Sequence, residues 1–312
     1  MTTVPFVDAA TVTRLLDYPT LVDRMRIAFL SPPIAPARLS LPIPAVVETG
    51  AGTLLVMPAL RPGGLVIVKV VAAHPHLAHR TQGTLTTTLL VLSAIDGTLL
   101  GLVDGHALTA RRTAATSVLA ASLLARPDAR RLLILGAGSV AFALAQAYVA
   151  CRSIDAVTIW TRRPAAAEGL AARLRGAGIN AGAATDLAEA AASADIVSTA
   201  TASTVPLLER SMIAPGTHLD LVGGFTPAMR EADDDLVASA RVVADGRPAV
   251  TEAGDLAGPV ARGVLDPARI TTLADLIAAP VARGAGELTL FKSVGLALED
   301  LAAAELLFER RE

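Results

Sequence analysis

The pattern of hydrophobic and polar positions changes about a third of the way along the chain. One helix-like segment at residues 19–30 is followed by a proline-rich stretch at 31–45, and then by four aliphatic, β-branched runs at residues 52–57, 64–71, 84–93 and 98–103. Asp96-Gly97 separates the last two runs, and this dipeptide is typical of a tight hairpin turn. The first hundred residues therefore predict a helix and an antiparallel sheet.

From residue 110 onward, helical periods alternate with short apolar runs. We predict helices at residues 110–125, 140–151, 165–176, 187–192 and 294–309, the last of them amphipathic, and strands at 132–135, 156–160, 180–183, 196–199, 218–222 and 241–244. Alternating strands and helices build a parallel sheet that is covered on both faces. The predicted fold class is α/β: a doubly wound, Rossmann-type parallel sheet domain plus an α+β domain.

Composition narrows the classes to which the chain can belong. A length of 312 residues fits about two domains, and 53% hydrophobic with 18% charged residues excludes a disordered or fibrous chain. The net charge of −2 provides no field that would attract nucleic acid or an acidic membrane. A single cysteine, Cys151, allows no intrachain disulfide, and the N-terminus has no signal-peptide pattern. We therefore expect a cytoplasmic protein.

Residues 132–151 are apolar enough to imitate a membrane span. A glycine turn inside this stretch favours a different interpretation, in which a buried strand is followed by a turn and a helix. The turn and its flanks read Gly136-Ala137-Gly138-Ser139-Val140. In a Rossmann turn the first glycine permits the tight bend, the second lets the backbone approach a pyrophosphate, and the helix N-terminus supplies free N–H groups. The strand–turn–helix context is the one this motif requires, and we predict a dinucleotide site here.

The end of the following strand indicates which dinucleotide is bound. An acidic residue there would hold the ribose 2′-hydroxyl of NAD and repel a 2′-phosphate. The chain instead has Trp160, followed by Thr161, Arg162 and Arg163. Two guanidinium groups and a hydroxyl suit a 2′-phosphate, although arginines are also ordinary in a solvated loop. We favour NADP(H), with NAD(H) as the alternative, and expect Thr199-Ala200-Thr201 to line the ribose side of the site.

These residues, together with four further segments, resemble the ornithine cyclodeaminase/mu-crystallin family over nearly the whole chain. The segments are RRTAA at 111–115, ADIVSTAT at 194–201, PGTH at 215–218 and TLFKSVG at 289–295. The resemblance implies a homodimer. It also implies a substrate-binding and dimerisation domain at residues 1–112 with 290–312, and an NAD(P)-binding domain at 113–289. It adds further cofactor contacts at Thr113, Val222, Gly223 and Lys292, the last of which would otherwise be read as a surface charge.

The resemblance implies a small imino or amino acid substrate whose carboxylate is held by three cations, Arg38, Lys69 and Arg112. Lys69 is supported by the sequence itself, because a lone lysine in an apolar strand needs a partner or a function unless it lies on an edge strand facing water. Lys69 and Arg112 are the catalytic candidates. Thr86 and Ser293 complete the expected substrate site.

The chain departs from the cyclodeaminase pattern at one position. The cyclodeaminase has an aspartate shortly after the glycines of the turn that begins at Val222, and this chain has Phe225 there. Cyclodeamination needs a base, whereas reduction of a preformed cyclic imine needs mainly positioning. We therefore expect an NADPH-dependent ketimine reductase, which converts Δ1-pyrroline-2-carboxylate to L-proline or Δ1-piperideine-2-carboxylate to L-pipecolate. The alternatives are an ornithine cyclodeaminase, an alanine dehydrogenase-like enzyme and a small-ligand-binding protein like mu-crystallin.

Other polar residues are interpreted as structural. We expect Asp220 at a strand end, and Glu231 with the acidic run at 233–235 at a solvated helix start. Three histidines lie close together in sequence, but no acid or cysteine accompanies them, and we expect no metal site at His74, His76 and His79.

Overall fold

The computed structural model describes residues 4–46, 50–74 and 85–311 and divides into two compact units. The first comprises Met1–Arg112 with Leu296–Glu312, and the second comprises Thr113–Gly295. Helix α3 (Gly105–Leu124) contributes its N-terminal part to the first unit and the rest to the second. The sequence analysis predicts that the chain leaves the second domain and re-enters the first at residue 290. The structure places it after Gly295, because strand β14 (Thr289–Lys292) is an inner strand of the second unit's sheet.

The first unit is built on a six-stranded sheet in the order β1-β6-β5-β4-β3-β2. Its strands are β1 (Phe6–Val7), β2 (Leu39–Val46), β3 (Gly50–Leu60), β4 (Leu65–Ala73), β5 (Leu85–Ser93) and β6 (Leu99–Asp104). Neighbouring strands of this sheet pair in antiparallel fashion, except that β1 and β6 are parallel. The proline-rich stretch, which the sequence presents only as a helix break, contains strand β2 with Pro42 and Pro44. Prolines fit there because β2 is an edge strand, where one side of the backbone needs no ladder.

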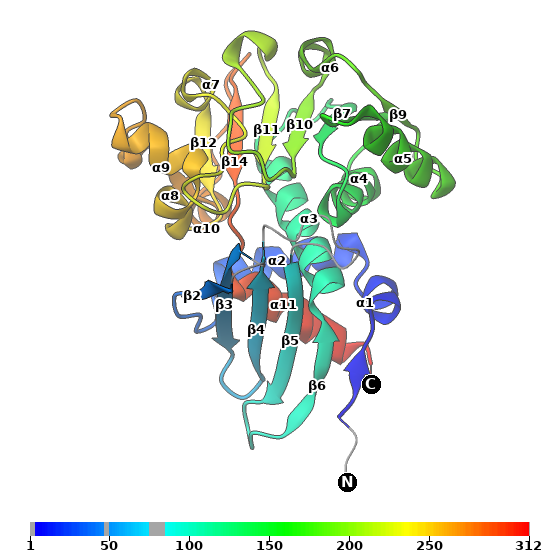
Figure 1. The fold of residues 1–312 in the computed structure, drawn as a ribbon, viewed down its shortest axis with the longest axis vertical. Coiled ribbons are helices and arrows are strands. Elements are labelled where there is room, and N and C mark those ends of the chain that lie inside the picture. Colours follow the sequence, from blue (N-terminus) through cyan, green and yellow to red (C-terminus); the bar gives the residue numbers. More distant parts are fainter. Residues whose placement is uncertain (1–3, 47–49, 75–84, 312) are drawn as a thin grey trace. The chain divides into compact units, whose positions relative to one another are not determined.

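Three helices complete the first unit: α1 (Ala9–Leu15), α2 (Tyr18–Leu30) and α11 (Ala297–Glu309). Helix α11 packs against β3 and β4 on one face of the sheet, and α2 packs against α11 (Figure 1). The sequence predicts an amphipathic α11, but the helix is buried on nearly every side, and even Glu299 and Asp300 are 0% exposed. The opposite face of the sheet keeps aliphatic side chains in solvent, among them Leu39, Leu41 and Val70.

The second unit is the predicted doubly wound domain, with eight parallel strands in the order β13-β12-β14-β11-β10-β7-β8-β9. The other strands are β7 (Arg131–Leu135), β8 (Ala156–Trp160), β9 (Ala181–Ala183), β10 (Ile196–Thr199), β11 (His218–Leu221), β12 (Arg241–Ala244) and β13 (Thr271–Thr272). Its helices are α4 (Ser139–Cys151), α5 (Pro164–Gly176), α6 (Leu187–Ser193), α7 (Asp234–Ser239), α8 (Pro248–Glu252), α9 (Gly254–Ala261) and α10 (Leu273–Ala278). Within the described ranges, no helix is long and apolar enough to cross a membrane.

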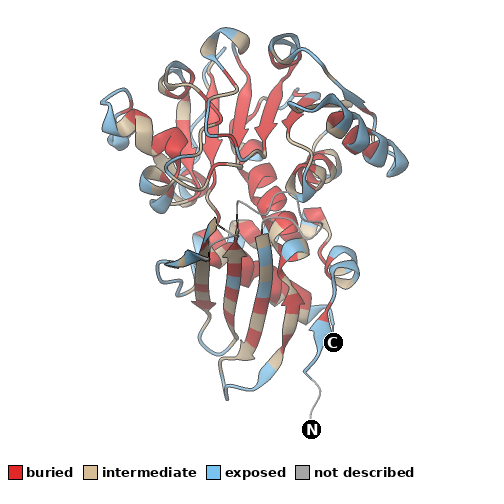
Figure 2. Cartoon of the chain, in the orientation of Figure 1, coloured by how far each residue is buried: buried red, intermediate tan, exposed pale blue. Residues whose placement is uncertain are grey.

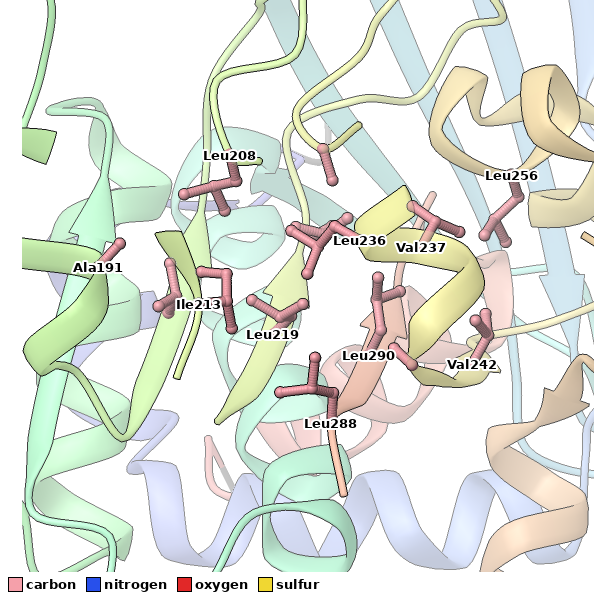
Figure 3. Packing of buried hydrophobic residues seen from close by; sticks show 14 of the residues in the cluster. Ala191, Leu208, Ile213, Leu219, Leu236, Val237, Val242, Leu256, Leu288 and Leu290 are labelled. Atoms are coloured by element: carbon pink, nitrogen blue, oxygen red, sulfur yellow. The ribbon is translucent and has the colours of Figure 1, made fainter. Parts of the chain in front are cut away.

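The strand order fixes where a ligand can enter the second unit. The chain builds outward from β7 to β9 and then returns to place β10 on the other side of β7. The turns after β7 and β10 therefore diverge, and α/β sheets bind ligands at the crevice opened by such a switch. The inner strands of the sheet are buried (Figure 2), as a sheet covered on both faces requires. Leu219, Leu236 and Leu290 pack together in one core cluster (Figure 3).

Candidate functional site

The turn after β7 has the geometry of a phosphate-binding turn. Gly136 has φ +122°, and a Cβ built on it would lie 2.6 Å from the carbonyl oxygen of Ala200, so the turn accepts no other residue. Gly138 is the N-cap of α4. No side chain of the described residues caps the helix, and beyond the adjoining backbone none of their atoms lies within 4 Å of a Cβ added to Gly138. The free N–H groups of α4 therefore face open space, which is the arrangement an anion needs.

A pocket of about 880 Å³ extends from this turn. It is lined by eight of the cofactor residues predicted from the sequence: Gly136, Ala137, Gly138, Thr161, Arg162, Arg163, Ala200 and Thr201. The other predicted cofactor residues do not line it: Thr113, Ser139, Val140, Thr199, Val222, Gly223 and Lys292. The pocket thus joins the two turns at the strand switch and leaves the remaining cofactor contacts as predictions.

The pocket contains three exposed guanidinium groups. Neither Arg162 nor Arg163 forms a side-chain hydrogen bond or ion pair with any residue that the structure describes. The hydroxyl of Thr161 donates a 2.6 Å hydrogen bond to the carbonyl of Arg163, so it shapes this loop. Sequence reasoning missed Arg173, which stacks over the ring of Phe142 at 4.4 Å. The signal was available in the helical period, because Ala166, Gly169, Leu170 and Arg173 form one face of α5 along the pocket wall.

Asp220 lies inside β11 rather than at a strand end, and it is 0% exposed. Its carboxylate accepts hydrogen bonds from the hydroxyls of Ser117 (2.9 Å), Ser198 (2.6 Å) and Tyr148 (3.1 Å). Burial raises the pKa of Asp220 to about 6, although the three hydroxyls oppose the rise. The charged form is therefore disfavoured in the folded state.

Asp220 should make the stability of the protein depend on pH. Folding favours the protonated carboxyl. The contribution of this carboxyl to the free energy of unfolding is fully present below its unfolded-state pKa of about 4, and it is lost as the pH rises through about 6. A shift of about 2 units corresponds to about 3 kcal/mol. We expect the Asp220→Asn variant, which stays neutral, to lack this loss between about pH 4 and pH 7. Urea unfolding at several pH values measures it, and parallel curves for wild type and variant would contradict the assignment.

The two catalytic candidates of the first unit meet in a buried ionic cluster. The Nζ atom of Lys69 lies 2.5 Å from Oδ2 of Asp300, whose Oδ1 accepts a 2.9 Å hydrogen bond from Nε of Arg112. Arg112 also donates from Nη1 to Glu299 at 2.6 Å. Strand β4 lies between β3 and β5, so Lys69 is not the edge-strand lysine that the sequence left as an alternative. Among the described residues, the cluster has two cations and two anions, which compensate one another.

Burial and ion pairing act against each other in this cluster. Burial lowers the pKa of Lys69 to about 8, and the negative charge of Asp300 limits the fall. Burial also disfavours the charged form of Arg112, but Asp300 and Glu299 outweigh it and raise the pKa of Arg112. Sequence reasoning missed the two acids. Two adjacent charges in the apolar segment 297–307 need partners, by the argument already applied to Lys69.

The three other predicted substrate residues come from different segments of the chain. Thr86 is exposed and pairs with Ala72, so it points to the sheet face opposite to Lys69. Thr86 and Lys69 therefore lie on different faces of the sheet, and the role of Thr86 in the wall of the substrate site stays a prediction. Arg38 is half-buried just before β2. Ser293 belongs to the second unit, where its hydroxyl donates to Asp245 at 3.0 Å.

Two charged residues of the second unit, Glu231 and Lys292, are buried rather than exposed to solvent. The neighbouring Asp233 does cap α7, with its side chain accepting from the N–H of Leu236 at 2.8 Å. Glu231, however, is 0% exposed rather than solvated. Lys292 is also 0% exposed, and its Nζ lies 3.0 Å from Asp255, which excludes the surface-charge interpretation.

Among the described residues, no group of three or more acids, histidines or cysteines is arranged to hold a metal. His76 and His79 lie outside those residues.

Comparison with known proteins extends over both units. The sequence model of the ornithine cyclodeaminase/mu-crystallin family matches residues 35–312. An uncharacterized protein of Schizosaccharomyces pombe is 38% identical over 320 residues, which cover 97% of this chain and 96% of that protein. A Δ1-pyrroline-2-carboxylate reductase of Paracoccus denitrificans is 46% identical over 171 residues, 54% of each chain. The solved structure of Thermococcus litoralis Δ1-pyrroline-2-carboxylate reductase with NADH and L-proline superposes with a TM-score of 0.91 at 29% identity, covering 99% of this chain and 97% of that one.

Proposed function

The chain belongs to the ornithine cyclodeaminase/mu-crystallin family, and from this premise we propose that it reduces a cyclic imino acid with NADPH. The lead substrate is Δ1-pyrroline-2-carboxylate, which would yield L-proline, and the six-membered Δ1-piperideine-2-carboxylate is its chemical homologue. The observation that carries the proposal is the pocket at the strand switch. There the N-terminus of α4 has no side-chain cap, and Arg162 and Arg163 have no side-chain partner among the described residues, so both features suit an anionic ligand. The matched reductases support the reaction class.

The residues present fit a dinucleotide with a 2′-phosphate. The open space at Gly138 admits a pyrophosphate against the N-terminus of α4. Arg162 and Arg163 would neutralise the 2′-phosphate, and none of the described residues that line the pocket carries a carboxylate to repel it. A nicotinamide bound in this way supplies a hydride to the imine carbon. The imine nitrogen must also carry one proton, either before the hydride arrives or after it. Hydride and proton together convert the imine to a secondary amine.

The remaining task of the protein is to hold the substrate carboxylate. We assign this task to Lys69 and Arg112, whose side chains are fixed in place by Asp300 and Glu299. Because these four charges compensate one another among the described residues, a bound carboxylate needs one more cation, and Arg38, which precedes β2, is the candidate. Phe225 is half-buried and offers no proton acceptor, which favours reduction over cyclodeamination.

The decisive experiment is an assay of the purified protein with NADPH and each cyclic imine. We expect loss of nicotinamide absorbance, with the matching cyclic amino acid formed in equal amount. The absence of turnover with both ring sizes would refute the reductase. Release of ammonia from ornithine without added reductant would instead establish a lyase.

We also propose that the protein is a homodimer that pairs through the open face of the first unit's sheet. Leu39, Leu41 and Val70 on that face are 52%, 42% and 38% exposed, and aliphatic side chains grouped on one open sheet face are typical of an association surface. Sedimentation equilibrium should give twice the mass of the chain, and a mass of one chain would refute the dimer.

A further inference from the structure

Glu231 is a buried carboxylate that joins two turns of the second unit. It is 0% exposed and lies in the loop before α7. Its Oε1 accepts hydrogen bonds from the backbone N–H of Thr201 at 2.8 Å and from the hydroxyl of Thr201 at 2.7 Å. Its Oε2 accepts from the N–H groups of Gly223 at 2.9 Å and Gly224 at 3.3 Å. Four donors thus satisfy one carboxylate, which offsets the cost of burying it.

The two turns held by Glu231 follow the neighbouring strands β10 and β11. They are packed so closely that a Cβ on Gly223 would lie 2.1 Å from the carbonyl oxygen of Thr201 and 2.4 Å from Oε1 of Glu231. Thr201 lines the pocket at the strand switch. The position of this pocket wall therefore depends on a carboxylate that does not itself line the pocket.

Two further charges hold Glu231 in place. Oδ1 of Asp255 accepts from the N–H groups of Glu231 at 2.7 Å and Ala232 at 3.1 Å. The buried ammonium of Lys292, at the end of β14, lies 3.0 Å from Asp255 and 3.9 Å from Glu231. The ends of three parallel strands, β10, β11 and β14, are thereby linked through two acids and one lysine. These strand ends form the edge at which α/β sheets bind ligands.

We propose that Glu231 is a positioning residue for the nicotinamide half of the cofactor, acting through Thr201 and Gly223. The inference rests on the proposed function, because it assumes that a dinucleotide enters the pocket. The adenosine half is served by Arg162 and Arg163, which Glu231 does not touch. The nicotinamide half must extend past the turn after β10. The Glu231 carboxylate holds this turn at a fixed distance from the turn after β11.

The test is the Glu231→Gln variant, in which one acceptor oxygen becomes a donor that faces the N–H groups of Gly223 and Gly224. Trp160 is the sole tryptophan of the sequence and lines the pocket, so its fluorescence reports ligand binding without turnover. We expect the dissociation constant for NADPH to rise at least tenfold. The constant for 2′,5′-ADP, which carries only the adenosine half, should change less than twofold. A variant whose fold is damaged throughout would bind both NADPH and 2′,5′-ADP more weakly.

Asp234→Asn is the matched control, because it makes the same carboxylate-to-amide change three residues away. Asp234 pairs with Arg230 and Arg262 and touches neither turn. It should leave both dissociation constants unchanged. Equal weakening of both ligands in the Glu231 variant, wild-type affinity for NADPH, or failure of the variant to fold would overturn the inference and leave Glu231 a stabilising residue only. Failure of the wild-type protein to bind NADPH would instead refute the proposed function.

Discussion

The free energy of unfolding is expected to fall by about 3–5 kcal/mol when Asp300 is replaced by asparagine. Asp300 is 0% exposed and is the shared partner of Lys69 and Arg112, at 2.5 and 2.9 Å. Removing its charge leaves two buried cations with Glu299 as the remaining anion of the cluster. The attraction that offset their desolvation is then lost, while the cost of burial remains.

Urea denaturation at neutral pH measures this loss. Glu309→Gln on the same helix is the control, because its pair with Arg24 lies at the surface and should contribute at most about 1 kcal/mol. A second check is the double variant Lys69→Met with Asp300→Asn, which removes one charge of each sign. Its loss should be smaller than the sum of the two single losses. Strict additivity would show that the pair is not coupled.

Cofactor preference is expected to shift by at least about 100-fold when Arg162→Asp is combined with Arg163→Ala. Both guanidinium groups line the pocket, and neither forms a side-chain ion pair with the described residues. Each charge-assisted contact with a 2′-phosphate contributes about 1.5–3 kcal/mol, and every 1.4 kcal/mol is a factor of ten. The introduced aspartate would also repel the phosphate and accept from a ribose hydroxyl.

The measurement is the ratio of kcat/KM for NADPH to that for NADH. Arg269→Asp is the control, since Arg269 is exposed in the second unit and does not line the pocket. It changes the net charge as Arg162→Asp does and should leave the ratio unaltered. If the double variant used both cofactors as the wild type does, the loop would have no role in selecting the 2′-phosphate.

The parts of the fold that the sequence predicts are those set by local periodicity. The stretch from β7 through the glycine turn to α4 agrees with its predicted bounds to within one residue, because its turn, cap and apolar strand are consecutive in sequence. Strand β14 was missed as part of the parallel sheet. Its four residues look like an ordinary apolar run, and only pairing with β11 and β12 makes them an inner strand.

The residues that line the pocket could be predicted where consecutive positions of one segment supply them, and not where residues of several segments meet. Arg162 and Arg163 follow directly from a strand end, and the structure places both at the pocket. Glu231 precedes three further acids, at 233–235, and therefore looks solvated, whereas its partners Thr201 and Gly223 reach it only through the sheet order. Thr86 shows why residues from neighbouring strands are hard to place from the sequence, because a register difference of one residue decides which sheet face carries the side chain.

The split composition of the first unit has a consequence for the order of folding. During synthesis the second unit is complete once Gly295 has emerged, so its parallel sheet can close as an independent body. The first unit, although begun earlier, still lacks α11 at that moment. Lys69 and Arg112 then have no counter-charges from Glu299 and Asp300, and the sheet face that α11 covers is open. Until α11 has been added, the N-terminal segment lacks the helix that completes its core and can be only partly folded.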